Sequence, residues 1–153
     1  MKKRGRGAKP ATITNKRARF DYELGDSLVV GLQLTGGETK SLRQGHGQLR
    51  GAYVTVKNNE LWLVNATITG SQGIPINEDG QTRSRKLLAK RREIDRLIAE
   101  KQGGKTIVPT ELITRGRYIK LRIAVGKGKK HYDKRETLKK RQELRDIDRE
   151  ARK

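Results

Sequence analysis

The chain has 153 residues, 37 of them Lys or Arg and 17 Asp or Glu, which gives a formal net charge of +20. No apolar run approaches the ~20 residues needed to cross a bilayer, no apolar stretch of a signal peptide follows the basic start, and the absence of cysteine excludes disulfides, thiolate zinc sites and cysteine nucleophiles. A charge this large repels itself, so we expect an acidic partner, with nucleic acid ahead of an anionic membrane surface.

The basic residues are unevenly distributed. Residues 1–19 carry eight basic and no acidic side chains, and residues 20–80 carry four basic and seven acidic ones. Residues 81–125 carry thirteen and four, and residues 126–153 carry twelve and six. This distribution predicts a folded core with phosphate-binding elements at both ends and in one internal stretch.

Apolar residues mark the expected boundaries of that core. They concentrate between Phe20 and Val125, whereas both ends of the chain contain too few to order themselves alone. We therefore predict a disordered basic arm over residues 1–12, a folded core over residues 13–125, and a basic tail over residues 126–153 that is disordered in the free protein.

The first half of the core is predicted to contain strands and one short helix. Residues 22–34 become increasingly apolar and predict a strand, bent at one of its glycines. A Thr-x-x-Glu spacing at residues 35–38 fits a capping box and predicts a short helix behind it. Strands over residues 52–57 and 60–69 flank Asn58-Asn59, and Asn tolerates the positive φ that a tight hairpin turn requires.

The second half is predicted to contain one long helix and a further hairpin. After a loop, a helix is expected from about Ser84 to Gln102, where two glycines end it. Strands over residues 107–114 and 118–125 follow, and Pro109 favours an edge position for the first of them. The element order predicts a mainly β fold, namely a small OB-like antiparallel β-barrel with about two to three helices and a basic C-terminal tail.

The end of the tail has the composition of a helix with little to pack against. Residues 136–153 are rich in helix formers and include favourable i,i+4 pairs such as Glu136 with Lys140. Apolar positions are few, and an isolated helix of this length is marginal in water. We expect this segment to become helical on contact with a partner.

Three cations, Arg83, Arg85 and Lys86, lie at the start of the predicted long helix. Cations are mildly unfavourable at the positive end of a helix dipole, whereas phosphate is favoured there. Phosphate binding would therefore explain these residues. The alternative is a solvated basic face.

Glu38 is an acid in a strongly basic protein. The capping box alone would account for it. The functional alternative is that its carboxylate accepts a hydrogen bond from an RNA base, because a carboxylate cannot serve a phosphate. Lys40 and Arg43 lie within about one turn and would flank it.

The start of the tail, Gly126-Lys-Gly-Lys-Lys130, lacks the spacing of a phosphate loop, so no nucleoside triphosphate site is predicted. Its lysines are expected to follow a nucleic-acid backbone, and Tyr132 either stacks on a base or serves as a local hydrophobic anchor. No serine lies in a nucleophile motif, no convergent carboxylates are identified, and His46 and His131 are too distant to predict a metal site. We expect no catalysis, no metal and no cofactor.

Several motifs occur together in a specific order. They are Asn15-Lys-Arg-Ala-Arg19, Leu34-Thr-Gly-Gly-Glu38-Thr-Lys-Ser-Leu-Arg43, Arg83-Ser-Arg-Lys-Leu-Leu88, Gly126-Lys-Gly-Lys-Lys130 and Asp133-Lys-Arg-Glu136. In order and spacing this set closely resembles the SsrA-binding protein family, also called small protein B, the bacterial partner of transfer-messenger RNA. The resemblance covers roughly residues 13–142.

The resemblance implies a six-stranded OB-like barrel that binds the tRNA-like domain of transfer-messenger RNA and helps to rescue stalled ribosomes. It implies a tail that becomes helical in the empty messenger channel near the decoding centre. Elongation factor Tu is a further expected partner in the delivery complex, and we expect a monomer in the bacterial cytoplasm with no membrane partner. The RNA-facing residues of the barrel would be Asn15, Lys16, Arg17, Arg19, Glu38, Lys40, Arg43, Arg83, Arg85, Lys86 and Leu88. The ribosome-facing residues of the tail would be Gly126, Lys127, Lys129, Lys130, Tyr132, Asp133, Lys134 and Arg135.

Other classes of protein remain open from the sequence alone. A structural ribosomal protein and a general RNA chaperone, each with an OB-like barrel, would share the composition. An RNA-processing enzyme would have to use the acids near Asp21, which lie beside no nucleophile or base.

Overall fold

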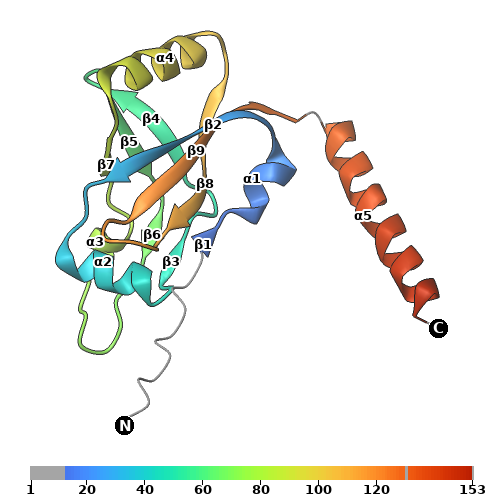
Figure 1. Ribbon diagram of the computed structural model, residues 1–153, viewed down its shortest axis with the longest axis horizontal. Coiled ribbons are helices and arrows are strands. Elements are labelled where there is room, and N and C mark those ends of the chain that lie inside the picture. The colour runs from blue at the N-terminus through green and yellow to red at the C-terminus, as the bar shows by residue number, and fades with distance from the viewer. Residues whose placement is uncertain (1–12, 130, 153) are drawn as a thin grey trace.

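The computed structural model describes residues 13–129 and 131–152, and strands dominate its larger part (Figure 1). The strands are β1 (Ile13–Thr14), β2 (Tyr22–Leu32), β3 (Gly47–Gln48), β4 (Tyr53–Lys57), β5 (Glu60–Val64), β6 (Thr67–Ile68), β7 (Arg85–Leu88), β8 (Thr106–Ile113) and β9 (Lys120–Gly128). The helices are α1 (Lys16–Asp21), α2 (Gly36–Arg43), α3 (Glu78–Gln81), α4 (Arg91–Gln102) and α5 (His131–Ala151).

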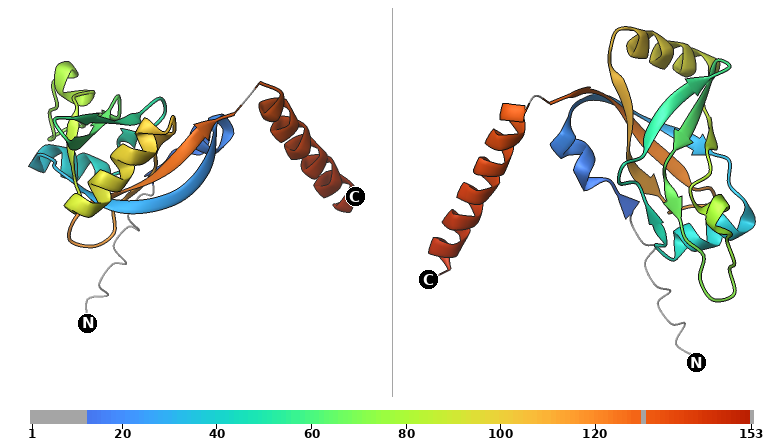
Figure 2. Two further views of the ribbon diagram at one scale, coloured as in Figure 1. Left: turned by 90° about the horizontal axis from the view of Figure 1, so that it is seen from above. Right: turned by 180° about the vertical axis from the view of Figure 1, so that it is seen from behind.

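Antiparallel pairing closes the sheet into a barrel. Its strand order is β1-β8-β4-β5-β7-β2-β9, and β8 also pairs with β9, so that six strands form a ring and β1 extends β8. The longest strand, β2, pairs with β9 from Tyr22 opposite Gly128 to Gly31 opposite Lys120. The helices α2 and α4 lie at opposite ends of this barrel (Figures 1 and 2). The predicted mainly β, OB-like fold is confirmed, with five helices in the described residues rather than two to three.

The barrel interior is mainly apolar. Alternate residues of the strands point inward, and helices contribute Leu42 and Leu97. Burying side chains of this kind is the main favourable term in folding. Those that are at most 1% exposed are Leu42, Leu49, Val54, Leu61, Leu63, Leu87, Ile107, Leu121 and Ile123.

The hairpin between β4 and β5 confirms the predicted tight turn. Asn58 and Asn59 have φ of 52° and 59°, and the pairing of Lys57 with Glu60 leaves only these two residues in the loop. The single strand expected over residues 60–69 is wrong, however. Asn65, with φ of 63°, separates β5 from β6, and β6 pairs with β3 instead.

Two predictions for the second half are also wrong. The helix expected from about Ser84 begins only at Arg91, because residues 85–88 form β7 between β5 and β2. Pro109 does not lie on an edge strand, since β8 has neighbours on both sides. The pairing of β8 with β9 shifts register between Pro109 and Glu111, and such an irregularity accommodates a residue with no N–H.

The tail begins later than predicted. Residues 126–128 continue β9 and pair with residues 22–24 of β2, so disorder from residue 126 is wrong for this stretch. The helix α5 then extends away from the barrel (Figure 2). The arm over residues 1–12 and Lys130 lie outside the described residues. Among the described helices, none is long and apolar enough to cross a membrane.

Candidate nucleic-acid interface

Glu38 lies at the centre of one group of predicted site residues. It is the third residue of α2, where its side chain accepts from the Thr35 backbone N–H at 3.0 Å while its own N–H donates to the Thr35 hydroxyl at 3.2 Å. The capping box is therefore confirmed. The Glu38 residue is only 2% exposed, and its two carboxylate oxygens accept hydrogen bonds from Arg83 and Arg85.

Arg85 is completely buried, with 0% exposure. Its five N–H donors have five acceptors: Glu38, two carbonyls within 3.0 Å and two carbonyls at 3.1 Å. Arg85 was predicted to lie at the N-terminus of a helix, where it could bind phosphate. It lies in β7 instead, and this strand points its side chain into the interior. Arg85 therefore joins α2 to the segment before β7 and has no donor left for a phosphate. The carbonyl acceptors belong to Ala66, Gly80, Gln81 and Arg83.

The electrostatics of this pair follow from burial and hydrogen bonding. Burial alone would raise the pKa of Glu38, but hydrogen bonds from Arg83, the Thr35 backbone and Arg85 outweigh it, so the pKa lies below its usual value. Burial lowers the pKa of Arg85, and Glu38 opposes that change. An arginine stays protonated in proteins, so the buried pair is ionised at neutral pH.

Arg43 and Lys40 differ in role although both lie near the end of α2. The Arg43 guanidinium donates to the carbonyls of Thr114, Gly116 and Arg117 at 3.0, 3.1 and 2.9 Å. Arg43 thus holds the loop between β8 and β9. Lys40 is exposed, and its ammonium is available on the surface of α2.

The rest of this group lies along β7. Arg83 is partly exposed while it pairs with Glu38, and Lys86 pairs with Glu60 at 3.1 Å. Leu88, in β7, is 52% exposed. We call Glu38, Lys40, Arg43, Arg83, Arg85, Lys86 and Leu88 the α2–β7 cluster.

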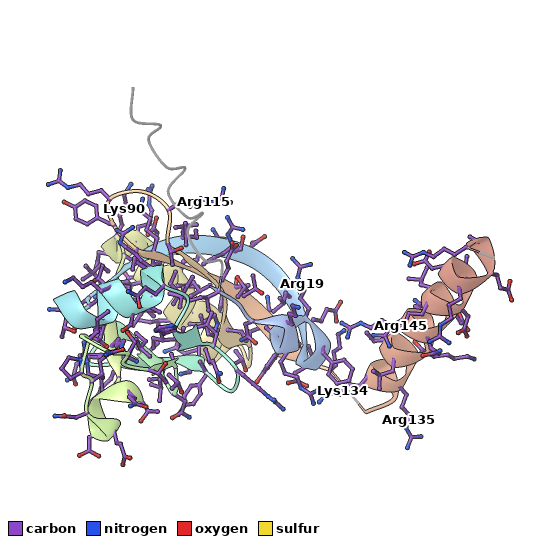
Figure 3. All side chains as sticks on the ribbon, turned by 90° about the horizontal axis from the view of Figure 1, so that it is seen from below. Arg19, Lys90, Arg115, Lys134, Arg135 and Arg145 are labelled. Atoms are coloured by element: carbon purple, nitrogen blue, oxygen red, sulfur yellow. The ribbon has the colours of Figure 1, made fainter. Side chains whose placement is uncertain are left out.

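A second group lies on α1, and we call Asn15, Lys16, Arg17 and Arg19 the α1 cluster. Asn15 is buried, and there its backbone N–H donates to the Thr110 carbonyl and its side-chain amide to the Pro109 carbonyl at 2.9 Å. The three cations that follow are exposed, and Arg19 projects from the helix (Figure 3). Lys16 and Arg19 also line a groove of about 810 Å³ between α1 and the barrel, together with Arg122 and Lys129.

The tail residues divide between strand and helix. Gly126 and Lys127 belong to β9, and Lys129 follows it. Lys134 pairs with Asp21 of α1 at 3.3 Å, and Arg135 points away from α1 (Figure 3). Tyr132 and Asp133 lie in the first turn of α5, where the structure describes the backbone only, and Lys130 lies outside the described residues.

The loop that Arg43 holds was not among the predicted site residues. Residues 115–118 are all exposed and contain Arg115, Arg117 and Tyr118. The signal available in the sequence was a glycine between two arginines, followed by an aromatic residue. Within the described residues, no group of His, Asp and Glu could hold a metal ion.

The chain combines a small closed β-barrel, basic clusters on its surface and a basic helix at its C-terminal end. These features are typical of nucleic-acid-binding barrel proteins. The family model described as SmpB protein matches residues 12–153, and the chain belongs to this family. The SsrA-binding protein of Trichormus variabilis is 44% identical over 142 residues, with 88% of each chain covered. That of Streptomyces avermitilis is 45% identical over 145 residues, covering 94% of this chain and 81% of the relative.

A solved structure agrees with these sequence comparisons. A chain of the structure described as "tmRNA-SmpB: a journey to the center of the bacterial ribosome" superposes with a TM-score of 0.65 and 36% identity. The match covers 78% of this chain and 85% of that chain. The similarity therefore extends over most of both chains.

Proposed function

We propose that this protein is an RNA-binding adaptor of trans-translation, which binds the tRNA-like domain of transfer-messenger RNA and delivers that RNA to stalled ribosomes. The observation that carries this function is the match of nearly the whole chain to the SmpB family and to SsrA-binding proteins. The exposed basic clusters supply the charge that such a partner requires.

The barrel holds the RNA in this proposal. Lys16, Arg17 and Arg19 contact phosphates, and so do Lys40 and Arg83, because these cations are exposed or partly exposed. Lys86 and Leu88 extend the contact along β7. The buried residues of the two clusters do not contact the RNA in this proposal. Asn15 and Arg85 hold the backbone that carries the exposed cations, and Glu38 holds the Arg83 side chain.

The tail contacts the ribosome in this proposal. The 21 residues of α5 span ~32 Å at 1.5 Å per residue, a length suited to a channel. Lys127, Lys129 and Lys130 precede it, and its first two turns contain Tyr132, Asp133, Lys134 and Arg135. We infer that the helix is stable mainly when it lies in the vacant messenger channel near the decoding centre, because residues 138–152 are exposed throughout.

The adaptor itself performs no chemistry in this proposal, since peptidyl transfer belongs to the ribosome. It acts as a monomer, with elongation factor Tu as a further partner in the delivery complex. Because its partner is the bacterial ribosome, its place is the cytoplasm.

Competition binding at fixed physiological salt tests the barrel's role. Labelled tRNA-like domain of transfer-messenger RNA is bound to the full chain and then challenged with bulk tRNA and duplex DNA. We expect a preference of about a hundredfold or more for the labelled RNA. Equal competition by all three would mean that the +20 charge alone does the binding, as in a general RNA chaperone.

A second experiment separates the tail from the barrel. Replacing Asp133, Lys134 and Arg135 by alanine should leave RNA affinity within about twofold and abolish rescue of ribosomes stalled without a stop codon. The matched control replaces Arg145, Asp146 and Arg149, which lie later in the same exposed helix. An equal loss of RNA binding in the first variant would contradict the division of roles.

A further inference from the structure

The loop between β8 and β9 exposes an aromatic ring among cations that form no ion pair with any described residue. Tyr118 is 68% exposed, and residues 115–117 beside it are exposed as well. An exposed tyrosine ring contributes little to the core, and tyrosine is enriched at binding interfaces because it combines an apolar ring with a polar hydroxyl.

The charge of this loop is not balanced locally. Arg91, Arg96 and Arg122, which are also exposed, each pair with a carboxylate. Within the described residues, neither Arg115 nor Arg117 forms an ion pair. Instead, the Arg117 guanidinium lies over the Tyr118 ring, 5.5 Å from its centroid. One face of the ring is therefore covered by a cation.

The loop is held in a defined conformation before any partner arrives. Gly116 has φ of +84°, a region that favours glycine, and Arg43 donates to three of the loop carbonyls at 2.9 to 3.1 Å. The strands on either side are joined by the pairing of Ile113 with Lys120. A surface that is ordered in advance loses less entropy on binding than one that must be ordered.

We propose that residues 115–118 form a base-stacking contact, in which the Tyr118 ring stacks on an unpaired RNA base and Arg115 and Arg117 contact its flanking phosphates. Aromatic rings alternating with cations bind single-stranded nucleic acid in this way. This proposal rests on the proposed RNA-binding function and adds a contact to it. The loop adjoins the C-terminal end of α2 through Arg43, so one RNA can contact both Lys40 and Tyr118.

Substitutions at Tyr118 test the contact in the full chain. We expect Tyr118→Phe to bind the tRNA-like domain of transfer-messenger RNA within twofold of the unmodified protein, because it keeps the ring. Tyr118→Leu keeps apolar bulk without a π face and should weaken binding about 5- to 150-fold, the range measured for loss of one stacked base. The slope of log affinity against log salt should not change, because stacking releases no counterions.

A fluorescence measurement reports the stacking itself. Trp62 is the single tryptophan, so the unmodified protein supplies the background for a Tyr118→Trp variant. Saturating RNA should quench the added emission. Full affinity of Tyr118→Leu, or unquenched emission at saturation, would overturn the contact and would favour a protein partner for the loop. Failure of the proposed function would be seen earlier, as equal binding of RNA and duplex DNA by the unmodified protein.

Arg43→Lys separates positioning from charge. The lysine keeps the positive charge but cannot donate to three carbonyls from a planar fork. If the loop must be held in place, this variant loses affinity like Arg43→Ala and reduces the quenching of Tyr118→Trp when the two are combined. Wild-type affinity and quenching in Arg43→Lys would show that Arg43 does not position the contact.

Discussion

Arginine is used in opposite ways in the barrel and in the tail helix. In the barrel, Arg85 is buried and each of its N–H donors has an acceptor. Arg43 donates to three carbonyls of one loop. In α5, Arg135 and Arg145 are exposed on a helix that carries little apolar surface. Composition alone does not distinguish these roles. The difference is set by whether a carboxylate or carbonyl from a distant part of the chain meets the guanidinium.

The comparison predicts its largest effect at Glu38. Glu38→Ala leaves Arg85 buried without its carboxylate, and breaking a buried pair in this way costs about 3–5 kcal/mol of the free energy of unfolding. Glu38→Gln keeps the shape and one acceptor, so it should cost less. Urea unfolding of the full chain measures both.

The matched control is the same substitution in the tail. Glu143 is exposed on α5, and Glu143→Ala should change the free energy of unfolding by less than about 0.5 kcal/mol. Similar losses for the two alanine variants would contradict the contrast between a structural barrel pair and a solvated tail.

Acid should act on the barrel through the same carboxylate. The pKa of Glu38 is lower in the folded protein than its usual value, so its contribution to stability is complete above about pH 5, where the unfolded chain is also ionised. The contribution is lost as the pH falls below about 4.3 and through the folded pKa. The difference in unfolding free energy between the unmodified protein and Glu38→Gln should therefore shrink on acidification, and parallel curves would exclude this account.

Glu38 also shows what sequence reasoning could reach. The capping box was predictable because Thr35 and Glu38 are three residues apart, and the hairpin turn because Asn58 and Asn59 are adjacent. The partner Arg85 is 47 residues away and gives no local signal. The sequence therefore predicted Arg85 to be a cation on the surface, although it is buried.

The missed strand β7 has a similar cause. Leu87, Leu88 and Ile94 have a spacing that fits one face of a helix, so a single helix from about residue 84 was the natural prediction. Pairing of residues 85–88 with β5 and β2 overrides that local preference. The functional family, in contrast, was predictable from the order of motifs, since this requires no knowledge of which side chains are buried.

The junction between the two regions should give a smaller effect. The Phe20 ring lies 4.6 Å from the Arg17 guanidinium and 5.8 Å from that of Arg141, and Lys134 pairs with Asp21 beside it. Phe20→Leu keeps apolar bulk but removes cation–π contacts worth about 0.5–1 kcal/mol each at exposed sites. We expect α5 to sample more orientations relative to α1.

Distance measurements between spin labels can detect this change. The chain has no cysteine, so Lys57→Cys with Glu143→Cys labels the barrel and the tail without a background. The distance distribution should broaden in Phe20→Leu while the free energy of unfolding falls by no more than about 2 kcal/mol, the sum of the two contacts. An unchanged distribution would mean that the remaining contacts fix the helix without the ring, namely the Lys134–Asp21 pair and the backbone bond from Lys129 N–H to the Asp21 carbonyl at 2.9 Å.

The smallest effect on stability is predicted where the tail has apolar residues without a partner. Leu144 and Ile147 are 63% and 61% exposed, and with Ala151 they form an i, i+3, i+7 stripe along α5. Leu144→Ala should leave the unfolding free energy of the chain unchanged within about 0.5 kcal/mol. If the stripe packs on a ribosomal surface, the same variant lowers rescue activity, because that surface would bury the side chain that the free protein exposes. Unchanged rescue would restrict the tail's contribution to its charges, and any large loss of stability would show that the barrel covers this stripe in solution.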